Sequence, residues 1–198
     1  TKHRVCTKGV RLEPNLSEME ETILKILVTG GTGYIGSHTC VELLNKGYEV
    51  VVFDNLYNSK IDVVDKIEKI TGKKITFYKA DMLDKESMRP IFEEHKLDAV
   101  IHFAGLKAVG ESVAKPLMYY QNNITGTLNL CELMKEYGCK RIIFSSSATV
   151  YGDPAQIPIT EECPKGTCTN PYGWTKSMLE QILSDFYTSD NEWSVVLL

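Results

Sequence analysis

Two residues that could do acid–base chemistry, Tyr172 and Lys176, stand four positions apart and directly follow Asn170-Pro171. Side chains at i and i+4 share one face of a helix, with Cβ atoms about 5–6 Å apart. A buried ammonium beside a phenol favours the phenolate, which can act as a general base. Asn170 suits an N-cap and Pro171 the first helical position, so we expect Tyr172 in the first helical turn. By itself this spacing is a weak signal, because a surface tyrosine and a solvated lysine would look the same.

A glycine-rich turn lies far upstream, in the stretch Gly30-Gly31-Thr32-Gly33-Tyr34-Ile35-Gly36. It follows an apolar run and opens a helical pattern, which is the context that the dinucleotide fingerprint requires. Such glycines let the backbone approach a pyrophosphate, and the helix N-terminus supplies N–H donors. Asp54 ends the next expected strand about 18 residues after Gly36. A carboxylate there can bind ribose hydroxyls and repels a 2′-phosphate, which favours NAD over NADP.

Other candidates follow the expected strands. Asp81 or its neighbour Met82 could meet an adenine, although a loop or cap role fits Asp81 as well. Phe103-Ala104-Gly105 could let the backbone lie against a cofactor or could form a tight turn. Asn58 and Ser59 could touch phosphate or cap the helix that follows.

A serine run, Ser145-Ser146-Ser147, follows the fifth expected strand, and ligands of doubly wound sheets bind at the carboxyl ends of the strands. No G-x-S-x-G elbow surrounds it, which disfavours a serine hydrolase. A hydrogen bond from Ser147 could hold a substrate hydroxyl in line with Tyr172. His102 lies in an apolar strand and is expected in the core, and His38 is expected to be structural.

Composition limits the partners of the chain. The 26 acidic and 22 basic residues give a net charge of −4, which disfavours binding to nucleic acid or to an anionic membrane surface. No apolar run approaches the roughly 20 residues of a membrane span, and no signal peptide is visible. The cysteines form no C-x-x-C pair and have no histidine at zinc spacing, so we expect reduced thiols, no metal and a cytoplasmic location.

Alternating strand and helix patterns predict an α/β fold, a Rossmann-type doubly wound parallel sheet. Residues 1–22 show no clear period and are interpreted as a disordered or artefactual extension, and 23–198 as a truncated NAD-binding domain. The expected strands are 24–29, 49–53, 75–79, 99–103, 141–145 and 194–198. The expected helices are 34–46, 62–70, 84–95, 116–137 and 171–187, with a Pro- and Gly-rich loop over 152–170.

Several stretches together resemble the UDP-glucose 4-epimerase family of extended short-chain dehydrogenases/reductases. They are Thr29 to Ser37, Asp54-Asn55, Phe103 to Ser112, Ser145 to Gly152 and Asn170 to Gly173, and the resemblance covers about residues 24–198. It implies Tyr172 as the base and Lys176 as its partner, with Ser147 also catalytic. It implies an NAD site made of Gly30, Gly33, Tyr34, Ile35, Gly36, Asp54, Asn55, Asn58, Ser59, Asp81, Met82, Phe103, Ala104, Gly105, Lys107, Asn122, Ser147, Tyr172 and Lys176. It implies a sugar site that includes Lys107, Ser147, Ala148, Thr149 and Tyr172.

The implied reaction interconverts UDP-glucose and UDP-galactose through a 4-keto sugar, as in galactose metabolism. Related 4,6-dehydratases carry an Asp-Glu pair where this chain has Ala148-Thr149, which disfavours dehydratase chemistry. Two alternatives stay open: epimerisation of another UDP-sugar, such as an N-acetylhexosamine or a uronic acid, and a non-catalytic NAD-binding fragment. The family's UDP-binding domain would lie beyond this chain, so the chain alone is expected to be poorly stable and inactive. The full-length form is expected to be a homodimer that packs through the helix 116–137 and the final helix.

Overall fold

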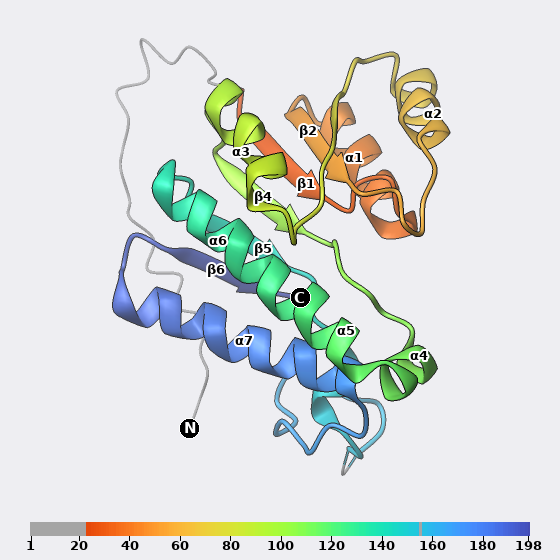
Figure 1. The fold of residues 1–198 in the computed structure, drawn as a ribbon, viewed down its shortest axis with the longest axis vertical. Coiled ribbons are helices and arrows are strands. Elements are labelled where there is room, and N and C mark those ends of the chain that lie inside the picture. Colours follow the sequence, from red (N-terminus) through yellow and green to blue (C-terminus); the bar gives the residue numbers. More distant parts are fainter. Residues whose placement is uncertain (1–22, 155) are drawn as a thin grey trace.

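The computed structural model describes residues 23–154 and 156–198, and one six-stranded parallel sheet organises them (Figure 1). The strand order is β3-β2-β1-β4-β5-β6. This is the order of the doubly wound dinucleotide-binding fold, so the predicted fold class is confirmed. The extension expected over residues 1–22 lies outside the described residues.

The expected strands and helices appear with ends that differ by at most two residues. The strands are β1 Lys25–Thr29, β2 Glu49–Asp54, β3 Thr76–Lys79, β4 Ala99–His102, β5 Arg141–Phe144 and β6 Ser194–Leu197. The helices that match are α1 Tyr34–Asn45, α2 Asp62–Thr71, α3 Lys85–Glu94 and α7 Pro171–Ser189. Within the described ranges, no helix is long and apolar enough to cross a membrane.

The expected helix over 116–137 needs a correction. It consists of α5 Pro116–Tyr120, a π-helical turn η1 Gln121–Thr125 and α6 Gly126–Glu136. Two short elements were not expected, the helix α4 Val109–Ala114 and the 3₁₀ turn η2 Ala148–Tyr151. The π-helical turn η1, the helix α4 and the turn η2 each lie beside a loop at the carboxyl ends of the strands. Irregular turns of this kind are often found at functional sites.

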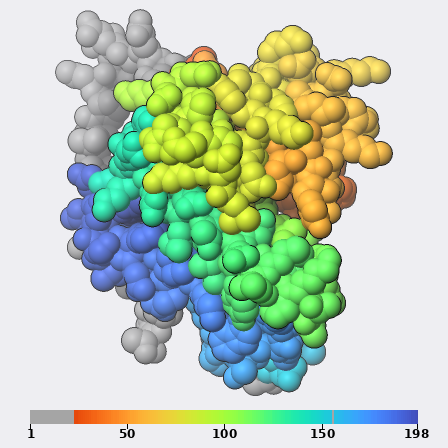
Figure 2. Space-filling model, viewed as in Figure 1, coloured from red at the N-terminus to blue at the C-terminus, as the bar shows by residue number. Residues whose placement is uncertain are grey.

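Helices cover both faces of the sheet, because successive strand residues point to opposite sides. Leu27 and Val51 pack with α3, α6 and α7, while their neighbours Val28 and Val52 pack with α1 and α2. The strands are therefore apolar on both faces, as parallel strands usually are. The space-filling view shows α3, α6 and α7 next to one another on the visible surface (Figure 2), and the buried cluster beneath them joins these helices to the sheet.

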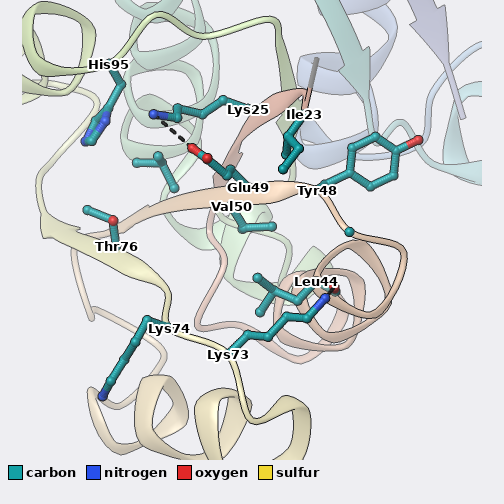
Figure 3. Close-up of a pocket in the computed structure, with 12 residues that line it drawn as sticks. Ile23, Lys25, Leu44, Tyr48, Glu49, Val50, Lys73, Lys74, Thr76 and His95 are labelled. Atoms are coloured by element: carbon teal, nitrogen blue, oxygen red, sulfur yellow. Dashed lines mark hydrogen bonds and ion pairs between the residues drawn. The ribbon is translucent and has the colours of Figure 1, made fainter. Parts of the chain in front are cut away.

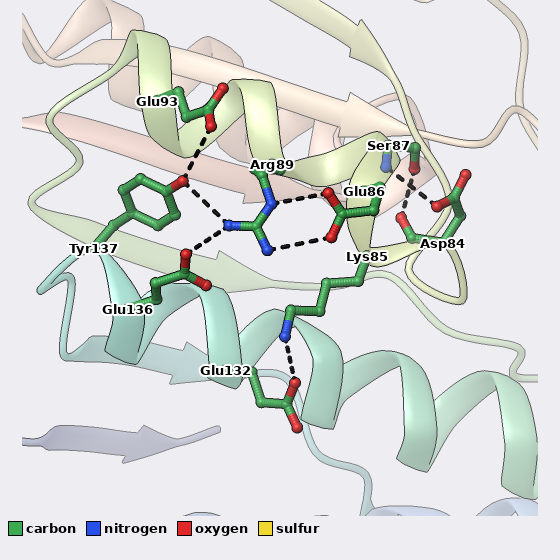
Figure 4. Close-up of polar contacts among 9 residues, drawn as sticks. All are labelled: Asp84, Lys85, Glu86, Ser87, Arg89, Glu93, Glu132, Glu136 and Tyr137. Atoms are coloured by element: carbon green, nitrogen blue, oxygen red, sulfur yellow. Dashed lines mark hydrogen bonds and ion pairs between the residues drawn. The ribbon is translucent and has the colours of Figure 1, made fainter.

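Polar contacts also join α3 to α6 at the surface (Figure 4). Arg89 of α3 lies 2.9 Å from Glu86 on its own helix and 2.6 Å from Glu136 of α6. Lys85 lies 2.6 Å from Glu132. Because these pairs are solvated at the surface, each adds little stability, and the buried apolar cluster beneath them carries most of the helix packing.

Candidate functional site

A cavity of about 510 Å³ opens at the carboxyl ends of the strands, where the strand order reverses between β1 and β4. In open α/β sheets this switch point is where ligands bind. Its wall combines the glycine turn, the ends of β2 and β3, the loop after β4, the helix α5 with η1, the end of β5 and the start of α7. The predicted residues in the wall are Gly30, Gly33, Tyr34, Ile35, Gly36, Asp54, Asn55, Asn58, Ser59, Asp81, Met82, Phe103, Ala104, Gly105, Lys107, Asn122, Tyr172 and Lys176.

The glycine turn is packed too tightly to admit side chains at two positions. Gly30 has φ +67°, and a Cβ there would lie 2.8 Å from the backbone nitrogen of Ala104. A Cβ on Gly36 would lie 2.3 Å from the carbonyl oxygen of Gly30. Gly33 is the N-cap of α1, whose first turn carries no acidic side chain. The N-terminus of α1 thus presents N–H groups to the cavity with no competing carboxylate, which suits a bound anion.

The loop after β2 is organised by Asp54, a largely buried carboxylate. Its Oδ1 accepts hydrogen bonds from the backbone N–H of Leu56 at 2.9 Å and from Ser59 Oγ at 3.0 Å. These bonds hold Leu56 at φ 61°, a left-handed conformation that is uncommon for a branched residue. Ser59 Oγ also lies 2.7 Å from Thr32 Oγ1 in the glycine turn. The alternative that Ser59 caps α2 is therefore wrong, since Ile61 is the N-cap and no side chain caps that helix.

The loop after β3 is tied to the loop after β2. Asn55 Nδ2 donates to Asp81 Oδ2 at 3.0 Å, and Asp81 Oδ1 accepts from the N–H of Leu83 at 2.9 Å. Asp81 consequently stabilises its own loop and also lines the cavity. The two alternatives raised by its position in the sequence are both compatible with this geometry.

Tyr172 and Lys176 lie as the helix signal predicted. Asn170 Oδ1 accepts from the N–H of Gly173 at 2.8 Å, and Pro171 takes the first helical position. The Lys176 amine lies 6.0 Å from the centroid of the Tyr172 ring and 4.6 Å from that of Phe144. It donates to the carbonyl oxygen of Ser145 at 2.6 Å. Burial lowers the pKa of Lys176 to about 8, and the charge of Glu180 acts in the opposite direction.

The structure does not bring all predicted residues of the serine run into the wall. Ser145 and Ser146 line the cavity, whereas Ser147, Ala148 and Thr149 do not. Ser147 Oγ instead accepts from the backbone N–H of Thr149 at 3.3 Å and from its hydroxyl at 3.0 Å. The reason is that Ser147 caps η2, which turns the chain away directly after β5.

Asn123 is a residue of this region that the sequence did not single out. It is buried in η1, and its Oδ1 accepts from the N–H of Leu106 at 2.8 Å. Its Nδ2 donates to the Leu106 carbonyl at 2.9 Å and to Thr175 Oγ1 at 3.1 Å. Asn123 therefore joins the loop after β4 to the helix that carries Tyr172. The pair Asn122-Asn123 inside a helical pattern was the available signal, since asparagine is a poor residue for helix interiors.

His102 is a core residue, as predicted. Its Nδ1 lies 2.7 Å from Thr29 Oγ1 and its Nε2 lies 2.8 Å from Thr127 Oγ1. Burial, with a smaller contribution from the charge of Lys176, lowers the pKa of His102 to about 3. The neutral ring thus links β1 and β4 to α6 below the cavity floor.

A second hollow of about 340 Å³ lies at the opposite, amino ends of the strands (Figure 3). Lys25 and Glu49, the first residues of β1 and β2, form a 3.0 Å ion pair in it. This is not the end of the sheet where doubly wound folds bind ligands. In the part of the chain that the structure describes, Cys40, Cys131, Cys139, Cys163 and Cys168 are free, and no cluster of side chains could hold a metal ion.

Comparisons with known proteins agree with this geometry. Residues 27–198 match the family model described as GDP-mannose 4,6 dehydratase. UDP-glucose 4-epimerase of Bacillus subtilis (strain 168) is 66% identical over 175 residues, which cover 88% of this chain and 51% of the relative. The crystal structure of UDP-glucose 4-epimerase from Bifidobacterium longum in complex with NAD⁺ and UDP is 54% identical with a TM-score of 0.86. That match covers 87% of this chain and 52% of the other.

The UDP-Glc/GlcNAc 4-epimerase from Campylobacter jejuni is 36% identical with a TM-score of 0.83, over 88% of this chain and 52% of the other. The resemblance to UDP-glucose 4-epimerases that was inferred from the sequence is confirmed. The chain spans about half the length of the curated relatives it matches.

Proposed function

This chain belongs to the family described as GDP-mannose 4,6 dehydratase, and on that premise we propose that it is the cofactor-binding and catalytic part of an NAD-dependent UDP-glucose 4-epimerase. The observation that carries the proposal is the convergence of the glycine turn, Asp54, Tyr172 and Lys176 on one cavity. The NAD⁺ and UDP named in the Bifidobacterium longum structure support the ligands proposed here.

The residues of the cavity suit NAD. The N-terminus of α1 would hold the pyrophosphate, and Asp54 would accept hydrogen bonds from the adenosine ribose hydroxyls. Because both observed bonds to this carboxylate end on Oδ1, we propose Oδ2 as the acceptor for the ribose. Asn55, Asn58, Asp81 and Met82 would contact the adenosine half, and Lys107 and Asn122 the nicotinamide half. Bound NAD supplies a hydride acceptor and donor that is regenerated within each turnover.

The proton steps belong to Tyr172. Its Oη takes the proton of the substrate 4-hydroxyl while C4 is oxidised, and it returns a proton after the 4-keto sugar has turned over in the site. Lys176 supports the phenolate by its positive charge. Ser147, Ala148 and Thr149 would sit beside the sugar, and Ser147 would hold its hydroxyl in line. Since these three residues lie outside the cavity wall, this part of the proposal rests on the family resemblance.

One feature of the sequence narrows the type of reaction. Ala148-Thr149 replaces the acidic pair of the related dehydratases, which favours epimerisation over elimination of water. The sugar substrate is less narrowly defined, because the Campylobacter jejuni relative is described as a UDP-Glc/GlcNAc 4-epimerase. UDP-N-acetylhexosamines are therefore the second substrates to test.

Replacement of Tyr172 tests the proposed mechanism. The full-length protein is expected to retain NAD through purification and to interconvert UDP-glucose and UDP-galactose. Tyr172→Phe removes the proton acceptor and should lower kcat by about two or more orders of magnitude. Tyr187→Phe removes a hydroxyl from an exposed position of the same helix and should leave kcat unchanged. Unchanged turnover in Tyr172→Phe would refute the mechanism.

A further inference from the structure

Glu180 is a buried carboxylate of α7 that the proposed reaction does not use. It is 6% exposed and lies one helical turn beyond Lys176. A buried charge is costly unless it is paired and hydrogen-bonded, so its partners indicate its role. Ser146 Oγ donates a hydrogen bond to Glu180 Oε1. The amine of Lys165, from the loop over 152–170, lies 2.5 Å from Glu180 Oε2.

Two residues of α7 therefore hold two consecutive residues after β5. Lys176 donates to the carbonyl of Ser145 at 2.6 Å, and Glu180 accepts from the hydroxyl of Ser146. Both serines line the cavity. Because the two bonds run from successive turns of one helix to adjacent residues, together they hold this segment in place along α7.

We propose that Glu180 is a positioning residue for Lys176, which keeps the buried amine positively charged and, through Ser146, holds the segment to which that amine is bonded. One part of this inference rests on the proposed function: that the charged amine serves to support the Tyr172 phenolate. The placement of the charges themselves stands independently of the reaction.

The groups that face Lys176 come from three elements. They are Tyr172 and Glu180 of α7, the Phe144 ring and Ser145 carbonyl at the end of β5, and His102 of β4, whose pKa the lysine charge helps to lower. Among these groups, Glu180 is the carboxylate, and Tyr172 carries a negative charge only after it has lost its proton.

The groups that face Glu180 itself are Lys165, Ser146, Tyr151 and Cys168. Burial, and after it the charge of Glu180, raises the pKa of Tyr151; burial, with Glu180 again contributing, raises that of Cys168.

The sign of the effect follows from these charges. Burial lowers the pKa of Lys176 to about 8, and the negative charge of Glu180 opposes that shift. Without Glu180 the pKa falls further, so the amine loses its proton at a lower pH. The cation beside Tyr172 is then absent from part of the neutral pH range.

The test measures the titration of Lys176 in the full-length protein with its bound nucleotide. Lysine side chains are labelled with ¹³C at Cε, and the Lys176 signal is assigned by its loss in Lys176→Arg. In Glu180→Gln the titration midpoint should move down by about one pH unit. Asp185→Asn makes the same charge change at an exposed position of α7 and should leave the midpoint in place. In a plot of kcat against pH, the fall in kcat on the alkaline side should begin at a lower pH in Glu180→Gln than in the wild type. Asp185→Asn should leave this part of the plot unchanged.

A second variant guards against misfolding. Glu180→Gln with Lys165→Gln avoids leaving the Lys165 ammonium without its partner. It should also shift the Lys176 midpoint down, because the Lys165 side chain is 44% exposed and its charge is screened more strongly than that of Glu180. An unchanged Lys176 midpoint in whichever of the two variants is folded would overturn the role of Glu180. Failure of the wild-type protein to epimerise UDP-sugars would instead overturn the proposed function, because the NMR titration does not depend on turnover.

Discussion

Tyr172 and Lys176 show how much a residue pair depends on its surroundings. On an exposed helix their spacing carries no function, but here Lys176 is 6% exposed and its amine is hydrogen-bonded to the carbonyl of Ser145 after β5. Burial brings its pKa to about 8, close enough to neutrality for its charge to respond to neighbours. Chemistry at this site is thus set by contacts from β4, β5 and α7 together.

Asp54 offers the sharpest single-residue test of cofactor choice. Asp54→Asn keeps an oxygen for Leu56 and Ser59 but removes the negative charge, so NAD should bind about tenfold more weakly. NADP should bind more tightly than to wild type, because the repulsion of its 2′-phosphate is relieved. Calorimetric titration of nucleotide-free full-length protein measures both. Asp65→Asn, on the exposed side of α2, is the matched control. If Asp54→Asn bound NAD as tightly as the wild type does, and NADP also as tightly as the wild type does, the role assigned to Asp54 would be contradicted.

A series of buried hydrogen bonds joins the elements around the cavity, in addition to their apolar packing. Thr127 Oγ1 lies 2.8 Å from His102 Nε2 and donates to the Asn123 carbonyl at 2.7 Å. Asn123 in turn reaches Leu106 and Thr175. The chain of bonds connects β4, η1 and α7, the elements that carry the nicotinamide side of the proposed site.

Thr127→Val is predicted to destabilise the protein by about 1–3 kcal/mol, because it leaves the buried Nε2 of His102 without a hydrogen-bond partner. Urea denaturation measures the change. Thr39→Val also removes a hydroxyl from a helix, but its bond to the Ile35 carbonyl lies at the surface, so its effect should stay within about 0.5 kcal/mol. Similar losses of stability in the two variants would show that the polar chain does not contribute beyond ordinary helix packing.

The regular elements could be predicted because their signals are local: apolar runs, Gly47, Gly72 and Gly138 after helices, and the Asn170-Pro171 start of α7. The irregular elements could not. The π turn contains Asn123, whose partners Leu106 and Thr175 stand 17 and 52 positions away. Glu180 looks like an ordinary helical glutamate until Ser146 and Lys165 are placed against it. Ser147 is expected beside the substrate because of the family resemblance, and the η2 turn that takes it out of the cavity wall leaves no clear pattern in the sequence.

At the scale of the whole molecule, loops from the ends of β1 to β5 build one cavity, and the chain spans about half the length of its curated relatives. The cofactor wall and the proposed base thus lie together at the carboxyl ends of one continuous sheet. We accordingly expect oxidation and reduction at the sugar C4 to take place in this half.

The fate of the hydrogen on C4 tests the central claim most directly. The full-length protein is given UDP-galactose that carries deuterium at C4, in ordinary water and without added NAD, and the product is analysed by NMR. If a tightly held nicotinamide accepts and returns that hydrogen while Tyr172 handles only the hydroxyl proton, UDP-glucose should form with the deuterium still on C4. Product that has exchanged its C4 deuterium for solvent hydrogen would contradict the account.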